Sequence, residues 1–305
     1  ELDIIRGRLF NFLLGLESLV YQQNHNFVYW IERSEGEILG NIHLKGEPVD
    51  ISEIMHEGIN TFYETVFFIS ATLTSNKDFS FTASRLGIYN HKSLLLDSPF
   101  NYKEQVLLYL DREIIEPNNP SYIEDSAKVS AEIINLIKGN CLILFTSYRM
   151  LDGVKEELLK IIDYPIYAQG DLPAAETVDK YIQDDGSVLM GTHSFWQGID
   201  LPGDLLRGVI LMRLPFSVPD RPLEQARIEM LQKQGLNPFI CYQLPNAILK
   251  FKQGFGRLIR SSNDTGIVAV LDSRIVTKSY GQNFLNSLPE CRIALGIDEL
   301  ISAFS

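Results

Sequence analysis

Residues 141–162 read CLILFTSYRMLDGVKEELLKII, a short apolar run that passes through two hydroxyl residues into an amphipathic pattern. The run at 142–145 has no polar alternation, which is typical of a strand buried on both faces. Apolar residues at helical spacing follow over 150–162. This stretch therefore predicts a buried strand that leads directly into a helix.

The same alternation of strand and helix extends along most of the chain. Further unbroken apolar runs, each expected to form a strand, lie at 66–69, 94–96, 106–110, 188–190, 209–214 and 267–271. Helical patterns lie between many of them, at 78–86, 122–138, 221–234 and 242–260. Alternation of this kind predicts an α/β fold, in which helices flank a parallel sheet on both faces.

The amino-terminal part of the chain has a different pattern. Apolar residues at helical spacing predict a helix over 2–22, and strands are expected at 27–30 and 38–44. Asp50 and Glu53 have the spacing of a capping box, which predicts a helix that continues to residue 63. We therefore predict an amino-terminal helical and strand appendage at 1–65 and one large lobe at 66–305.

Composition narrows the class of protein. The 305 residues are 45% hydrophobic and 22% charged, which is typical of a globular chain. No apolar run reaches eighteen residues, so no membrane span is expected. Three dispersed cysteines without C-x-x-C spacing predict reduced thiols in a cytoplasmic protein, with no zinc site and no iron–sulfur cluster in this chain.

The ends and the charge of the chain give two further expectations. The sequence begins without Met and without the features of a signal peptide, which favours a piece of a larger protein. The net charge of −12 argues against a broad electrostatic surface for nucleic acid. It is compatible with a narrow groove in which hydroxyls and backbone amides hold one strand.

Four segments that follow expected strands carry candidate chemistry, because ligands of open α/β sheets bind outside the carboxyl ends of strands. The first is 70–73, in which Ser70 and Thr72 can bond a neighbouring loop or a phosphate. The second is 145–150, in which Thr146 and Ser147 precede a helix whose first amides can bind an anion. The alternative for the first segment is an ordinary transition from a strand to a turn, and the alternative for the second is a simple helix N-cap.

The third segment is 191–203, where glycines bracket a polar and aromatic loop. Thr192 and Ser194 can hold a sugar-phosphate backbone, and Phe195 or Trp196 can stack on a base. Asp200 can interact with a nucleotide. The alternative is that the aromatic pair plugs a gap in the protein interior.

The fourth segment is 253–260, late in the helix expected at 242–260. Arg257 and Arg260 are three residues apart, so a helix would project them from one side, with Gln253 one turn earlier. Two guanidiniums together can bind polyphosphate oxygens. Gly254 and Gly256 are costly inside a helix, and close approach of a partner to the backbone would explain them. The alternative is a pair of surface arginines.

Taken together and in this order, the segments resemble the late motifs of superfamily 2 helicases of the DinG/XPD branch. Residues 70–73 look like motif III, 145–148 like motif IV, 191–203 like motif V and 253–260 like motif VI. Residues 194–200, 214–216, 280–281 and 288–289 are also similar to the bacterial DinG group. The resemblance covers roughly residues 50–290.

The resemblance implies a RecA-like second lobe of an ATP-driven motor that moves on single-stranded DNA. Arg257 and Arg260 would be arginine fingers, and the nucleotide cleft would be lined by Gln253, Gly198 and Asp200. Residues implied to contact single-stranded DNA are Ser147, Tyr148, Gln169, Thr192 and Trp196. Ser70 and Thr72 would couple the two sites, and no residue is expected to bind a metal.

Two early helicase motifs do not occur in the sequence. It contains neither the phosphate-binding G-x-x-x-x-G-K-[ST] nor a D-E-x-H. We therefore expect ATP and Mg²⁺ to be bound mainly by an upstream lobe of the same polypeptide, and the chain alone to be inactive as an ATPase. One alternative is a stand-alone RecA-like module that binds single strands or a protein without catalysis. Another is a kinase or metabolic α/β enzyme with accidental matches.

Overall fold

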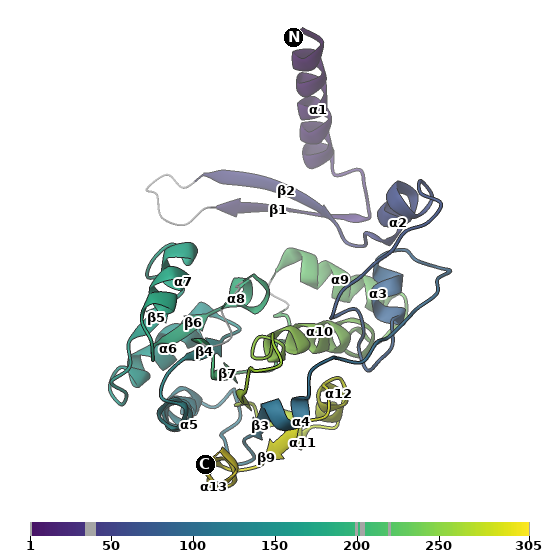
Figure 1. Cartoon of the computed structure of the whole chain (residues 1–305). Coiled ribbons are helices and arrows are strands. Elements are labelled where there is room, and N and C mark those ends of the chain that lie inside the picture. Colours follow the sequence, from purple (N-terminus) through teal and green to yellow (C-terminus); the bar gives the residue numbers. More distant parts are fainter. Residues whose placement is uncertain (1, 34–40, 199–200, 202–204, 219–220, 305) are drawn as a thin grey trace. The chain divides into compact units, whose positions relative to one another are not determined.

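The structure is a computed structural model that describes residues 2–33, 41–198, 201, 205–218 and 221–304 (Figure 1). Its contacts divide the chain into two units. Unit 1 comprises Glu1–Ile69, Ser80–Lys92 and Ser217–Gln243, and unit 2 comprises Ser70–Phe79, Ser93–Phe216 and Leu244–Ser305. This division differs from the single boundary predicted after residue 65, because two later segments pack with the amino-terminal residues.

Unit 2 is built on a seven-stranded sheet in which every neighbouring pair is parallel. Its order is β5-β6-β4-β7-β8-β3-β9. The strands are β3 (Val106–Leu110), β4 (Cys141–Leu144), β5 (Ile166–Ala168), β6 (Val188–Gly191), β7 (Gly208–Leu211), β8 (Gly266–Val270) and β9 (Arg292–Ala294). The predicted α/β fold with a parallel sheet is confirmed.

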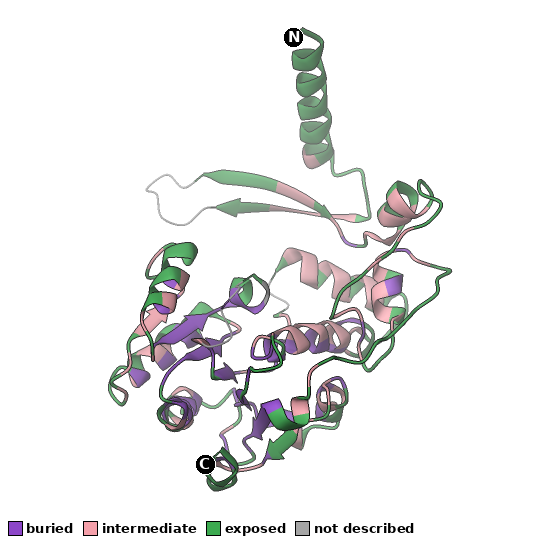
Figure 2. Ribbon diagram, viewed as in Figure 1, coloured by how far each residue is buried: buried purple, intermediate pink, exposed green. Residues whose placement is uncertain are grey.

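Helices cover both faces of this sheet. One face packs against α5 (Tyr122–Ile137), α6 (Tyr148–Leu158) and α13 (Ile297–Phe304), which share a single apolar core with the strands. The other face carries α7 (Ala174–Gln183), α8 (His193–Gln197), α10 (Leu244–Phe255) and α12 (Gly281–Asn286). The short helices α4 (Tyr102–Gln105) and α11 (Arg274–Thr277) adjoin strand ends. Figure 2 shows the inner strands of the sheet as the buried centre of the unit, whereas the edge strands β5 and β9 are less buried.

The central strands are apolar throughout because both of their faces are covered. In β4, Leu142, Ile143 and Leu144 each have 0% of their surface exposed, although their side chains point alternately to the two faces. Such strands show no alternation of polar and apolar residues in the sequence. This is why β3, β4, β6, β7 and β8 were predictable from unbroken apolar runs.

Two predicted strands are wrong. Residues 66–69 and 94–96 have no strand pairing in the structure. Phe67 is 82% exposed and Ile69 is 91% exposed, and Leu94 and Leu96 are each about three-quarters exposed. An apolar run becomes a strand only where a neighbour supplies a hydrogen-bonded ladder, and the described part of the chain supplies none here. The two edge strands β5 and β9 were missed because each has only three residues.

The predicted helix at 242–260 is shorter than expected. A π-helical turn, η3 (Phe239–Gln243), leads into α10, which ends at Phe255. Beyond Phe255 the pattern changes, with Arg257 N bonded to Gly254 O at 3.2 Å, and the Asp264 carboxylate accepts from the N–H groups of Arg260 and Ser261. Those amides therefore form a turn and do not extend the helix.

Unit 1 contains α1 (Leu2–Tyr21), an antiparallel pair β1 (Phe27–Arg33) and β2 (Ile42–Pro48), α2 (Ser52–Met55), η1 (His56–Asn60), α3 (Ser80–Arg85) and α9 (Pro222–Lys233). The amino-terminal helix is confirmed, but none of its side chains is buried. None of the described helices is long and apolar enough to cross a membrane.

Two local predictions in unit 1 are wrong. The second strand begins at Ile42 and runs to Pro48, later than the predicted 38–44, of which residues 38–40 lie outside the described part. The capping box does not form, because Asp50 accepts from Ser52 N at 2.9 Å and the helix N-cap residue is Ile51. The helix then ends at Asn60, before residue 63.

The burial of β4 gives a direct test of this fold. We expect Ile143→Ala to lower the free energy of unfolding by about 2–5 kcal/mol, because it leaves a cavity in the middle of the sheet. Ile161→Ala is the matched control, since Ile161 is 46% exposed and its loss should change stability little. Urea unfolding of both variants measures the difference. Equal stability of the two variants would contradict the position of β4 in the sheet.

Candidate functional site

The carboxyl ends of β4, β5 and β6 bring together four of the five residues predicted to contact a nucleic-acid strand. Ser147 and Tyr148 follow β4, Gln169 follows β5, and Thr192 follows β6. These three strands are neighbours in the sheet and run in the same direction, so their carboxyl ends share one edge. Ser147 is the N-cap of α6, and its side chain accepts from Met150 N at 3.4 Å.

The side-chain amide of Gln169 links these elements. Its Oε1 accepts from Thr192 N at 2.7 Å and from Thr192 Oγ1 at 3.0 Å. Its Nε2 donates to Tyr148 Oη and to Ser194 Oγ, each at 2.9 Å. One side chain therefore holds the ends of three strands in a fixed arrangement. We name Tyr148, Gln169 and Ser194 the hydroxyl–amide cluster.

The residues of this edge differ in exposure. Tyr148 is 51% exposed, and Ser147 and Ser194 are also exposed. Thr192 is 5% exposed, and both its N–H and its hydroxyl bond Gln169. The predicted contact of Thr192 with a nucleic acid is therefore replaced by an internal contact, because its donors already serve the amide.

Trp196 is packed in the protein interior and not presented on the surface. It is 3% exposed, and its indole Nε1 donates to Phe145 O at 3.0 Å. Its ring lies against α10 at Gly254, where an added Cβ would come within 2.8 Å of Cζ3. The burial supports the packing interpretation over the predicted stacking on a base. It also explains Gly254, because the partner that approaches this backbone is Trp196.

Arg257 and Arg260 lie beyond the end of α10, so the prediction that they share one face of a helix is wrong. They nevertheless reach the same segment of backbone. Arg257 donates to Trp196 O from Nε at 2.9 Å and from Nη2 at 2.5 Å, and Arg260 Nη1 donates to Leu201 O. Both guanidiniums thus meet the chain that leaves α8, the region predicted to line a nucleotide cleft.

The backbone at Arg260 is fixed by Asp264, a nearly buried carboxylate. Burial raises the pKa of Asp264. Hydrogen bonds from the Ser261 hydroxyl and from the N–H groups of Arg260 and Ser261 lower it by more than burial raises it, so the pKa lies below its ordinary value. Gln105 Nε2 donates to the carbonyls of Ser261 and Asp264 at 2.9 and 2.8 Å. The backbone of Arg260 is therefore fixed by the Asp264 carboxylate, and the turn that contains both residues is fixed by Gln105.

The remaining predicted nucleotide residues are only partly placed. Gln253 is half-buried in α10, one turn before Arg257. Gly198 is exposed and ends α8, with its N–H bonded to Ser194 O. Asp200 lies outside the described residues. No group of three or more potential metal ligands occurs in the part of the chain that the structure describes.

The predicted coupling segment has a clear internal partner. Ser70 Oγ accepts from Thr72 N at 3.2 Å, which forms a local turn. Two residues later, Thr74 is buried, and Lys252 of α10 donates to its O at 3.0 Å and its Oγ1 at 3.2 Å. Burial lowers the pKa of Lys252. Sequence reasoning missed this lysine because a single Lys in an amphipathic helix is usually a surface residue.

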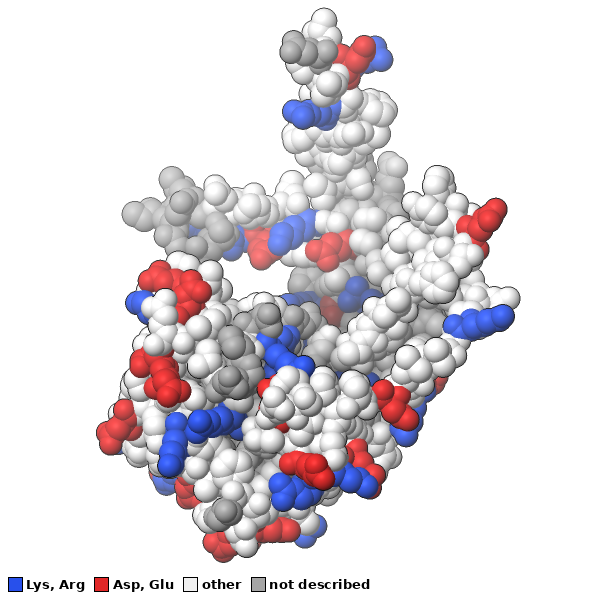
Figure 3. All heavy atoms as spheres, viewed as in Figure 1, with Lys and Arg blue, Asp and Glu red and all other residues white. Residues whose placement is uncertain are grey.

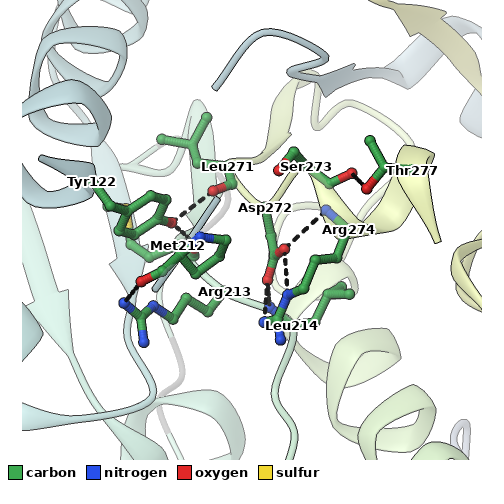
Figure 4. A network of polar contacts seen from close by, with 10 residues as sticks. Tyr122, Met212, Arg213, Leu214, Leu271, Asp272, Ser273, Arg274 and Thr277 are labelled. Atoms are coloured by element: carbon green, nitrogen blue, oxygen red, sulfur yellow. Dashed lines mark hydrogen bonds and ion pairs between the residues drawn. The ribbon is translucent and has the colours of Figure 1, made fainter. Parts of the chain in front are cut away.

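A second group missed from the sequence lies at the carboxyl ends of β7 and β8 (Figure 4). Asp272, with 0% exposure, accepts from Leu214 N at 2.8 Å and from Arg274 Nε and Nη2 at 2.9 and 2.7 Å. Tyr122 of α5 donates to Leu271 O at 2.6 Å and to Met212 O. These bonds tie the two strand ends to each other. The usable signal was an Asp-x-Arg directly after an apolar run.

One face of the molecule shows how charged side chains are distributed. On the face seen in Figure 3, acidic and basic side chains are interspersed and most of the surface is uncharged. That face shows no broad basic surface, and the net charge of the chain is −12. Any anion bound at the hydroxyl–amide cluster is therefore held by hydrogen bonds more than by a broad positive potential.

Asp264 gives a prediction with a defined pH dependence. Because its folded pKa is lowered, its contribution to stability is present above the unfolded pKa of about 4 and is lost as the pH falls through the folded pKa. We expect Asp264→Asn to cost about 1–3 kcal/mol at pH 7. The difference from wild type should shrink as the pH falls below about 4. Thermal unfolding at pH 3 and pH 7 measures this, and a difference independent of pH would contradict it.

Comparisons with known proteins agree with this arrangement. Residues 130–291, more than half of the chain, match the family described as the helicase C-terminal domain. ATP-dependent DNA helicase YoaA of Haemophilus influenzae is 35% identical over 300 residues, which cover 98% of this chain and 46% of that protein. The protein named 3'-5' exonuclease DinG of Bacillus subtilis is 32% identical over 299 residues, which cover 95% of this chain and 32% of that protein.

The fold is also found in a solved structure. An XPD helicase superimposes with a TM-score of 0.63 at 18% identity, covering 88% of this chain and 48% of that chain. That likeness confirms the RecA-like fold. The chain spans less than half the length of each of these three proteins. With the family match and the relatives taken together, the chain belongs to the helicase C-terminal domain family, in its DinG/XPD branch.

Proposed function

We propose that this chain is the second motor lobe of an ATP-dependent DNA helicase. In this role it supplies Arg257 and Arg260 to ATP hydrolysis and an edge of its sheet to single-stranded DNA. The observation that carries the proposal is that the two guanidiniums bond the carbonyls of Trp196 and Leu201, which lie five residues apart. Two segments far apart in the sequence thereby form one site on the face of the sheet that carries α8 and α10.

The two arginines have the chemistry that phosphoryl transfer needs. Negative charge on the transferred phosphoryl group and the leaving oxygens is stabilised by fixed cations, and a guanidinium is planar and always protonated. A guanidinium has five N–H donors in a fork, so one side chain is able to bond a backbone carbonyl and a phosphate oxygen. Support comes from the Asp264 turn, which limits the motion of Arg260 before any nucleotide arrives.

The other part of the ATP site lies outside the 305 residues in this proposal. The sequence has no phosphate-binding loop, and the curated relatives are more than twice as long as the part that this chain matches. We propose that a first lobe binds ATP with Mg²⁺, which would offset phosphate charge. The exposed Phe67 and Ile69 fit this proposal, because a sheet in the first lobe would give their segment the hydrogen-bonded ladder that it lacks here.

The edge at the carboxyl ends of β4, β5 and β6 is proposed to bind the DNA strand. Exposed hydroxyls of Ser147, Tyr148 and Ser194 suit a sugar-phosphate backbone, and they read no base sequence. Coupling between the two sites is proposed to run through Lys252. It joins the segment at 70–74 to α10, which ends two residues before Arg257.

A binding module without catalysis remains the second candidate. The observation that favours it is the same missing phosphate-binding loop. The two functions differ in what the arginines do, since a module that only binds DNA has no need of guanidiniums that respond to ATP.

The first test uses the 305-residue chain itself. We expect it to release no phosphate from ATP, with or without single-stranded DNA, because nothing in it replaces the phosphate-binding loop. Phosphate release is followed on purified protein with added Mg²⁺. DNA-stimulated turnover that stays with the chain through purification would contradict the second-lobe proposal.

The second test concerns Arg260 in a protein that joins this lobe to an ATP-binding lobe. Arg260→Ala should lower DNA-stimulated ATP turnover by about 10³-fold, while nucleotide affinity falls far less. Arg260→Lys should restore little, because a point charge does not replace the planar fork. Arg112→Ala, at an exposed site on the same unit, is the control. Normal turnover in a folded Arg260→Ala protein would favour the binding module.

A further inference from the structure

The direction of the hydrogen bonds around Gln169 is fixed by the backbone. The N–H of Thr192 only donates, so the atom 2.7 Å from it is the amide oxygen Oε1. The amide nitrogen Nε2 therefore lies on the other side, 2.9 Å from Tyr148 Oη and 2.9 Å from Ser194 Oγ. An amide nitrogen does not accept, so both hydroxyls accept from it.

A hydroxyl that accepts from Nε2 keeps its own proton for a second partner. Tyr148 is 51% exposed and Ser194 is exposed, so that partner comes from outside the protein surface. Both oxygens are bonded to one nitrogen and therefore lie within twice 2.9 Å of each other. Two O–H donors are thus presented side by side at the carboxyl ends of β4 and β6.

Thr192 shows the opposite polarity. Its hydroxyl donates to Oε1 at 3.0 Å, so its proton is already used inside the protein. Thr192 is also only 5% exposed. The amide thus separates the three hydroxyls into one internal donor and two external donors.

We propose that Gln169 is a positioning residue that makes the Tyr148 and Ser194 hydroxyls into a two-donor site for a backbone phosphodiester of single-stranded DNA. The inference rests on the proposed function and deepens it. A phosphodiester oxygen accepts and never donates, so it matches two outward donors at every nucleotide, whereas the donors and acceptors on base edges differ from one base to the next. The site uses neutral groups, so it suits a chain whose net charge is −12.

The first measurement removes each hydroxyl from the 305-residue chain. Binding of a fluorescently labelled single-stranded oligothymidylate is titrated at several salt concentrations. Tyr148→Phe and Ser194→Ala should each weaken binding about tenfold. The slope of log affinity against log salt should stay the same, because a neutral hydroxyl releases no counterion from the strand. Both positions are exposed, so neither variant should lose stability, and thermal unfolding checks this.

The second measurement reverses the polarity of the cluster. Gln169→Glu keeps the acceptor for Thr192 but has no N–H donor, so both hydroxyls should turn inward and donate to the carboxylate. Binding should fall at least about tenfold below that of Gln183→Glu, a variant with the same added charge at an exposed position of α7. In the Gln169→Glu background, Tyr148→Phe and Ser194→Ala should have no further effect.

The outcomes distinguish the positioning role of Gln169 and the phosphate site from DNA binding by the lobe as a whole. If removing the hydroxyls still weakens binding tenfold in the Gln169→Glu background, the added charge explains the loss and the positioning role is rejected. If wild type binds but Tyr148→Phe and Ser194→Ala bind equally well, the phosphate site is rejected while DNA binding by the lobe stands. A wild-type chain that binds no single strand at low salt rejects the DNA part of the proposed function and this inference with it.

Discussion

The contact between the Trp196 ring and the backbone of α10 at Gly254 sets the distance on which the rest of the site depends. An added Cβ at Gly254 would lie 2.8 Å from the indole, so only glycine lets α8 and α10 approach this closely. Once the ring is seated, the carbonyl of Trp196 is within reach of Arg257, and Leu201 is within reach of Arg260. An apolar contact inside the lobe thereby determines the positions of the Arg257 and Arg260 guanidiniums.

The polar groups of the lobe follow a common arrangement, in which a buried acceptor fixes the backbone and a neighbour faces outward. Asp264 holds the turn at Arg260, and Asp272 holds Leu214 and Arg274 at the ends of β7 and β8. The half-buried Gln169 combines both roles, since its Oε1 accepts from Thr192 N and its Nε2 donates to two exposed hydroxyls. Each acceptor is fully or mostly bonded within the protein, so ordering it costs nothing further when a ligand binds.

Much of the fold was predictable because burial on both faces leaves an unbroken apolar run, as in β4. The same pattern misled at 66–69, since a run of apolar residues does not reveal whether a neighbouring strand is present. For the site, an expected strand end led to Ser147, helical spacing led to the two arginines, and the family resemblance led to Gln169. The sequence left two environments open for Trp196, and the structure has the packed one. Lys252 was missed because its partner Thr74 lies far away in the sequence. Asp272 was missed because its bond to Leu214 N is equally distant, and the nearby Arg274 was the usable local signal.

The order of strands in the sheet has a consequence for the synthesis of the protein. β3 is made well before its two neighbours in the sheet, β8 and β9, which begin at Gly266 and Arg292. About 150 residues separate β3 from β8, so at 5–20 residues per second a ribosome needs roughly 8–30 s to supply the first partner. During that interval the segment Val106–Leu110, apolar along its whole length, has both edges unpaired. The nascent chain therefore depends on α5, the next element to emerge, or on a chaperone to keep β3 from pairing with another molecule.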